Sequence, residues 1–205
     1  MTLVQSRTRH RLSAADILPL DEYTRVRAER RREIARLKQR RRVEVGTFAT
    51  CYFENYDTMR QQVQEMLYIE KGGAAQLADE LEAYNPLIPQ GRELVATVMF
   101  EIEDATRRAR MLSQLGGIEN SVLIEVAMAG GTARIRGEPD PTRENTSPEG
   151  KASSVQFIHF PFTAEQVAAF KAPGAQVAVG FDHPNYGHMA RLSEPVRAAL
   201  AEDFD

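Results

Sequence analysis

The sequence predicts an α+β fold: a mixed, largely antiparallel sheet with interspersed helices and a basic N-terminal helix. Short segments rich in β-branched and aromatic residues recur along the chain, the strongest being ELVATVMFEI at 93–102, which is apolar on both faces and therefore predicted to be central. Between them lie segments with a period of about 3.6. SVLIEVAM and TARIR flank the short turn AGG, which is typical of an antiparallel hairpin.

The other elements follow in order along the chain. Two strands surround Gly46, and a helix capped by Asn55 or Asp57 then runs to Gly72-Gly73. A second helix stops at Asn85-Pro86, where the proline disfavours helix. The remaining predictions are a helix at 104–115, a strand in SSVQFIHFPF, a helix at 163–170, strands in AQVAVGF and HMARL, and a closing helix from Ser193. The segment 137–151 has three prolines and almost no apolar residue, which predicts a mobile loop.

The composition is that of a soluble globular protein. The chain has 205 residues, of which 42% are apolar and 27% charged, enough for one large domain or one domain with an appendage. Its one cysteine, Cys51, excludes an intramolecular disulfide and a cysteine cluster from this chain alone, and strand alternation favours a place in the core. No segment approaches the ~20 apolar residues that a membrane span needs, so we expect no membrane and a cytoplasmic location.

Positive charge is concentrated near the N-terminus. The segment 25–42, RVRAERRREIARLKQRRR, carries +8, whereas the whole chain carries −3, so the rest carries −11. We expect an arm and a basic helix in 1–42, with the helix at about 22–41, followed by an α+β domain at 43–205. Ion-pair spacing at Arg25–Glu29 and Glu33–Arg36 favours a solvated face. The alternatives are docking of an acidic protein and binding of nucleic acid, although no aromatic residue lies among the arginines for stacking on bases.

The segment FDHPNYGHMARL places two histidines at either end of a tight turn. His183 and His188 could share one side of a hairpin, with Asp182 as a third ligand or an outer acceptor and Tyr186 as a further contact. Such a set suits zinc or iron(II) if another carboxylate joins. The alternative is a structural turn, because Asp, Pro, Asn and Gly are ordinary turn residues.

Polar residues at the ends of two other elements are candidate ligand-binding groups. Glu54 closes a strand, and Asn85 lies beside two prolines in AYNPLIP, although capping also explains an asparagine there. His159 is interpreted as a core or rim histidine. The chain has no phosphate-binding glycine loop, no nucleophile elbow and no His-Glu-x-x-His helix. Catalytic residues are therefore not identified, and the sequence does not decide whether the protein is an enzyme.

Three blocks carry a family resemblance: YFENYDTMRQQVQEMLYIEK, ELEAYNPLIPQGRELVATVMFEIED and VGFDHPNYGHMARLSEPVRAALAED. Together with the basic opening segment they resemble, over 16–204, an uncharacterised bacterial family, the domain-of-unknown-function family numbered 3501. Its members are often encoded beside rubrerythrin-like di-iron proteins and flavin or iron–sulfur oxidoreductases. The resemblance implies an accessory protein that docks such a redox partner in electron transfer or peroxide handling. It implies no catalytic residue.

Three hypotheses for the function therefore remain. The first is a cytoplasmic accessory protein that docks a redox partner through complementary charge. The second is a metal-binding protein or metalloenzyme that uses His183 and His188. The third is a nucleic-acid-binding protein that uses the basic helix.

Overall fold

The strands form two antiparallel sheets. The computed structural model describes residues 9–205. Within this part, sheet A has the order β1-β2-β3-β7-β6 and sheet B the order β5-β4-β8-β9, and every pairing between strands is antiparallel. The strands are β1 (Arg42–Val45), β2 (Ala49–Glu54), β3 (Glu93–Phe100), β4 (Val122–Met128), β5 (Gly131–Arg136), β6 (Glu138–Pro139), β7 (Val155–Pro161), β8 (Val177–His183) and β9 (Tyr186–Arg191). The α+β class is confirmed, and β3 is central in sheet A as predicted.

The main core lies where the two sheets face each other. Cys51 on β2 and Val98 on β3 are opposite each other across the ladder, and both are fully buried. Phe100 of sheet A contacts Phe181 of sheet B, with ring centroids 6.0 Å apart. Burial raises the pKa of Cys51 to about 12, so its thiol remains neutral. The core interpretation of this cysteine is confirmed.

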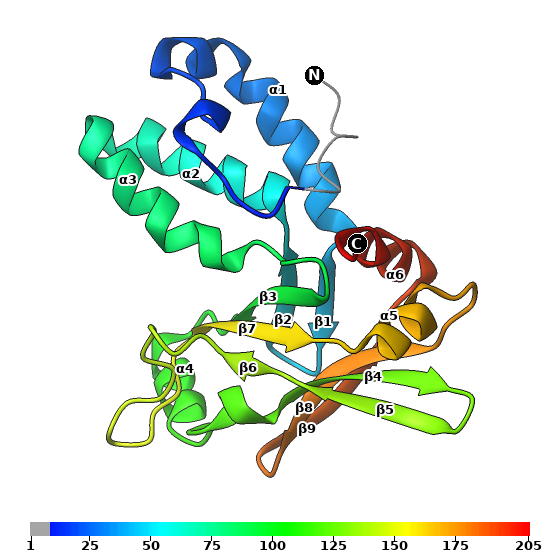
Figure 1. Cartoon of the computed structure of the whole chain (residues 1–205). Helices are drawn as coiled ribbons and strands as arrows, with labels where there is room; N and C mark the ends of the chain where they lie inside the picture. The colour runs from blue at the N-terminus through cyan, green and yellow to red at the C-terminus, as the bar shows by residue number, and fades with distance from the viewer. Residues whose placement is uncertain (1–8) are drawn as a thin grey trace.

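Three helices cover the outer face of sheet A, on the side away from sheet B (Figure 1). They are α1 (Leu20–Gln39), α2 (Tyr56–Glu70) and α3 (Gly73–Tyr84). A second core joins α2 and α3 to the sheet, because Met59 and Val63 of α2 pack with Val95 of β3, and Leu77 and Leu81 of α3 pack against this cluster. The backbone N–H of Thr58 donates to the Asn55 side chain at 3.0 Å, which confirms Asn55 as the cap of α2. On α1, Tyr23 is the one buried residue, as its narrow apolar stripe predicts.

The second half of the chain adds α4 (Ala105–Leu112), α5 (Ala164–Lys171) and α6 (Glu194–Leu200). Helix α4 ends at Leu112, earlier than the predicted end at 115, and the chain continues in turns. The segment 137–151 contains β6, which the sequence did not predict, and Thr146 forms a bridge to Ala152. Its mobility stays a prediction. No helix in residues 9–205 has the length and apolarity to cross a membrane.

Candidate functional site

Tyr186 fastens the β8–β9 hairpin to the turn between β1 and β2. Its buried hydroxyl donates to the carbonyl of Val45 at 2.7 Å and accepts from the backbone N–H groups of Phe48 at 3.2 Å and Ala49 at 3.1 Å. A Cβ at Gly46, where φ is +69°, would lie 2.7 Å from the same hydroxyl. Glycine is therefore required at this turn. Tyr186, predicted as a ligand-binding residue, has its hydrogen bonds filled by the protein itself.

The two histidines lie on the same face of sheet B, but Asp182 does not. In the ladder, His188 is opposite Phe181 and His183 is opposite Tyr186, which places all four on one face. The His183 Nε2 atom lies 3.4 Å from the carbonyl oxygen of Gly116, and the His188 ring packs edge-on against Tyr186 with centroids 4.5 Å apart.

Strand alternation turns the Asp182 carboxylate to the opposite face, where it lies 3.8 Å from Arg134. Within residues 9–205 no group of three or more His, Cys, Asp or Glu residues is arranged to hold a metal ion. The ligand roles of His183 and His188 stay a prediction.

Glu54 and Asn85, the other two predicted site residues, make different kinds of contact. Glu54 is buried and accepts a hydrogen bond from the Thr97 hydroxyl at 2.7 Å. Asn85 holds the chain segment 9–18, here named the N-terminal strap. The backbone N–H of Leu12 donates to its Oδ1 at 2.6 Å, and its Nδ2 donates to the carbonyl of Leu12 at 3.1 Å. Asn85 thus satisfies both backbone groups of a buried residue.

Gln64 holds the other end of the strap in the same way. The backbone N–H of Leu18 donates to its Oε1 at 2.9 Å, and its Nε2 donates to the carbonyl of Leu18 at 3.1 Å. The phrases QEML and AYNPLIP, which carry part of the family resemblance, therefore each contribute one amide clamp to the strap. Sequence reasoning missed Gln64, because a clamp across 46 residues leaves no local pattern.

Glu65, the next residue in QEML, fastens α1 to α2. It accepts hydrogen bonds from Arg27 at 2.9 and 2.8 Å and from the hydroxyl of Tyr23. Burial raises the pKa of the Glu65 carboxyl, but the hydrogen bonds from Arg27 and Tyr23 outweigh it and leave the pKa below its ordinary value. Burial, followed by the hydrogen bond to Glu65, raises the pKa of Tyr23 to about 12. Glu65 is therefore charged and Tyr23 neutral near pH 7, which suits this contact.

Arg41, just beyond the end of α1, is also turned inward. It forms a buried ion pair with Asp203 and donates to the carbonyls of Phe53 at 3.0 Å, Glu54 at 3.1 Å and Ala199 at 3.3 Å. Burial raises the pKa of Asp203 even though Arg41 lies against it. This cluster joins the end of α1 to the region of α6, and Figure 1 shows these two segments side by side. Arg27 and Arg41 are thus structural and do not belong to an exposed cationic surface.

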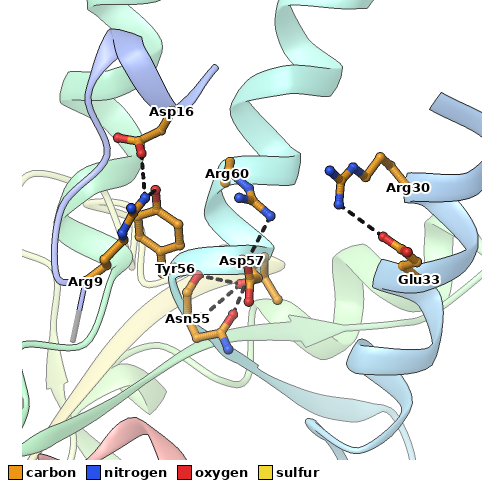
Figure 2. A network of polar contacts seen from close by, with 9 residues as sticks. Arg9, Asp16, Arg30, Glu33, Asn55, Tyr56, Asp57 and Arg60 are labelled. Atoms are coloured by element: carbon orange, nitrogen blue, oxygen red, sulfur yellow. Dashed lines mark hydrogen bonds and ion pairs between the residues drawn. The ribbon is translucent and has the colours of Figure 1, made fainter. Parts of the chain in front are cut away.

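Cations on the strap, on α2 and on α1 form ion pairs with nearby acids. Figure 2 shows these pairs, which are Arg9 with Asp16, Arg60 with Asp57, and Arg30 with Glu33. Arg25 lies 3.6 Å from Asp21. The predicted pairs Arg25–Glu29 and Glu33–Arg36 do not form. Arg25 pairs instead with Asp21, and Glu33 pairs with Arg30; both partners precede them in the sequence. The prediction that α1 carries local ion pairs is correct, but their partners differ.

The opposite side of α1 carries cations that have no ion pair with any other residue in 9–205. We name it the basic face, and it consists of Arg32, Arg36 and Arg40. Arg32, Arg36 and Arg40 recur every four residues and so form one stripe. They lie toward the C-terminal end of the helix, where the helix dipole favours positive charge. The basic face is the candidate functional site, because exposed guanidinium groups are able to contact anionic groups.

Comparisons with known proteins agree with the family resemblance. The sequence matches the family described as protein of unknown function (DUF3501) over residues 11–204. The fold is similar to the crystal structure of a novel protein of unknown function from Burkholderia pseudomallei K96243, with a TM-score of 0.86 and 36% sequence identity. That match covers 95% of this chain and 99% of the other. No curated protein matches the sequence. The chain belongs to the DUF3501 family of proteins of unknown function.

Proposed function

We propose that this protein is an accessory protein that docks an acidic partner protein through the basic face of α1. The observation that carries the proposal is the contrast between the two sides of this helix. One side is fastened to α2 by Tyr23 and Arg27, whereas the other presents three cations, Arg32, Arg36 and Arg40, that lack an ion pair among residues 9–205. A fixed cationic surface on an otherwise acidic protein steers and orients a negatively charged partner.

An oxidoreductase is the partner that the family resemblance implies. A rubrerythrin-like protein, or a flavin or iron–sulfur oxidoreductase, would supply the cofactor, and this chain would supply the docking surface in electron transfer or peroxide handling. The chain's one cysteine is buried with a raised pKa, which leaves it no thiolate chemistry of its own. Redox encounters use small interfaces in which charge makes a large contribution to the association rate.

Nucleic acid is the competing ligand for a cationic helix. The basic face could neutralise phosphates, but the inward Arg27 and Arg41 reduce the positive charge available to a duplex. No aromatic residue lies between Arg25 and Arg42 to stack on bases, so a single strand is also poorly served. These two features favour an acidic protein.

A pull-down from nuclease-treated lysate of the native host tests the proposal. The bait is the full chain, compared with the variant Arg32→Ala/Arg36→Ala/Arg40→Ala. Arg107→Ala/Arg110→Ala is the matched control, because it removes two exposed cations from α4. We expect the wild type and the control to retain an oxidoreductase at low salt and the triple variant to lose it. Absence of any oxidoreductase at both low and high salt would refute the proposal.

Metal binding at the β8–β9 hairpin is a second proposal, and it rests on one observation. The supporting observation is that His183 and His188 lie on one face of sheet B. A zinc or iron(II) ion between them would need its other ligands from water or from a partner, since Asp182 faces the other way.

A further inference from the structure

A hollow of about 410 Å³ lies beside the end of α1, where β1, β9 and α6 meet. Its apolar lining comes from Val43 of β1, Ala190 of β9 and Val196 of α6. Val43 and Val196 are buried and Ala190 is half-buried, so the apolar groups form the deeper part. Arg42, Glu44 and Arg191 also line the hollow, and all three residues are exposed.

The rim is continuous in chain and in charge with the basic face. Gln39, which also lines the hollow, lies between Lys38 and Arg40 in the sequence. Arg191 has no ion pair with any residue in the described part of the chain. Arg42 is partly neutralised, because it lies 2.8 Å from Glu44 and 4.0 Å from Glu101. The hollow therefore has an apolar interior and a charged rim, on which Arg191 has no ion pair in the described part of the chain and Arg42 is shared with Glu44.

We propose that this hollow is the anchor of the docking site and takes one apolar side chain from an acidic segment of the partner. The inference rests on the docking function proposed above and adds what the partner must present: an aliphatic or aromatic residue flanked by carboxylates. The carboxylates would contact Arg191 and the basic face, while the apolar side chain would contact Val43, Ala190 and Val196. Protein interfaces commonly combine an apolar centre with a charged rim in this way.

Synthetic peptides test the inference without the natural partner. One peptide consists of glutamates with a single central leucine, and the matched peptide has serine at that position. Fluorescence anisotropy with the full-length protein measures both affinities. Because a leucine side chain gains free energy when its apolar surface leaves water, we expect the leucine peptide to bind about tenfold more tightly, which corresponds to about 1.4 kcal/mol. Equal affinities for the two peptides would overturn the inference.

Three variants locate the binding. Ala190→Glu places a carboxylate in the hollow, and it should abolish the preference for leucine. Arg191→Ala should weaken binding of both peptides about threefold, as expected for one exposed charge pair. Glu44→Gln should strengthen binding about threefold, because it releases Arg42. Arg107→Ala, at an exposed cation on α4, is the control and should change nothing. Circular dichroism and thermal unfolding confirm that each variant is folded.

Failure of this inference and failure of the docking function give different results. If both peptides bind equally and the variant Arg32→Ala/Arg36→Ala/Arg40→Ala loses them, docking through α1 stands and the anchor is rejected. A leucine preference that persists in Ala190→Glu would also reject this hollow as the anchor. If the wild type binds neither peptide, the docking function and the anchor are both rejected.

Discussion

Glu65 on α2 receives two hydrogen bonds from the guanidinium of Arg27 on α1, at 2.9 and 2.8 Å. This contact fixes the rotation of α1 about its own axis, because Tyr23, one turn earlier, donates to the same carboxylate. Arg32 and Arg36 are then directed away from the body. The orientation of the basic face thus depends on one acidic residue in the neighbouring helix.

Glu65→Gln is expected to lower the free energy of unfolding by ~1–3 kcal/mol, since hydrogen bonds to charged groups are lost from a partly buried site. Glu80→Gln on α3 is the control; the carboxylate of Glu80 accepts a hydrogen bond from the side chain of Gln76 at 3.1 Å and has no ion pair among residues 9–205. Urea unfolding measures both. Equal stability of Glu65→Gln and the wild type would show that this contact does not hold α1.

The same contact should make stability depend on pH. The folded-state pKa of Glu65 lies below its ordinary value, so its contribution is complete above the unfolded-state pKa of about 4.3 and is lost as the pH falls through the folded-state pKa. The difference in unfolding free energy between the wild type and Glu65→Gln should therefore be largest at neutral pH and shrink in acid. A difference that stays constant down to acid pH would contradict this assignment.

Gln64→Ala should release one end of the N-terminal strap. Both backbone groups of Leu18 lose their partner, and we expect a cost of ~1–3 kcal/mol together with faster hydrogen exchange at the Leu18 amide. Gln62→Ala is the matched control, because Gln62 makes one long contact of 3.5 Å with Tyr84. Unchanged exchange at Leu18 would show that the amide clamp is dispensable.

Tyr186→Phe should destabilise the protein by ~1–3 kcal/mol without leaving a large cavity. The substitution removes three hydrogen bonds and leaves the carbonyl of Val45 and the N–H groups of Phe48 and Ala49 without that partner. Tyr52→Phe removes a more exposed hydroxyl, bonded to Glu101, and should cost less. Thermal unfolding distinguishes the two, and equal costs would show that the Tyr186 hydroxyl has no special role in joining the sheets.

The metal hypothesis makes its own prediction. Protein purified from its own host without a polyhistidine tag should contain stoichiometric zinc or iron(II), and His183→Ala and His188→Ala should each lose it. Elemental analysis and native mass spectrometry measure the content. Absence of metal after reconstitution, or the same content in both variants, would leave the hairpin with a structural role.

Much of the fold could be predicted because its signals are local. The apolar run of β3, the Asn55 cap and the Ala129-Gly130 turn between β4 and β5 each depend on a few neighbouring residues. Strand β6 could not be predicted, because Glu138-Pro139 has no strand pattern and forms a strand through pairing with β7, which is distant in the sequence. The division into two sheets also depends on packing between distant segments.

The candidate site was predictable in charge but not in detail. The composition of 25–42 predicts a basic helix. The structure is needed to show that Arg27 pairs with Glu65 and that Arg41 pairs with Asp203. Alternation along β8 does separate Asp182 from His183, and extending the strand to His183 would have revealed this from the sequence. The clamp by Gln64 joins residues far apart in the chain and has no counterpart in a local pattern.

The most direct test is the affinity of the purified protein for the oxidoreductase recovered by pull-down, measured by titration calorimetry at about 50 mM and about 200 mM salt. The account predicts that affinity falls with added salt, falls about tenfold or more in Arg32→Ala/Arg36→Ala/Arg40→Ala, and is unchanged in Arg107→Ala/Arg110→Ala. An affinity that is the same at both salt concentrations and in the triple variant would contradict it.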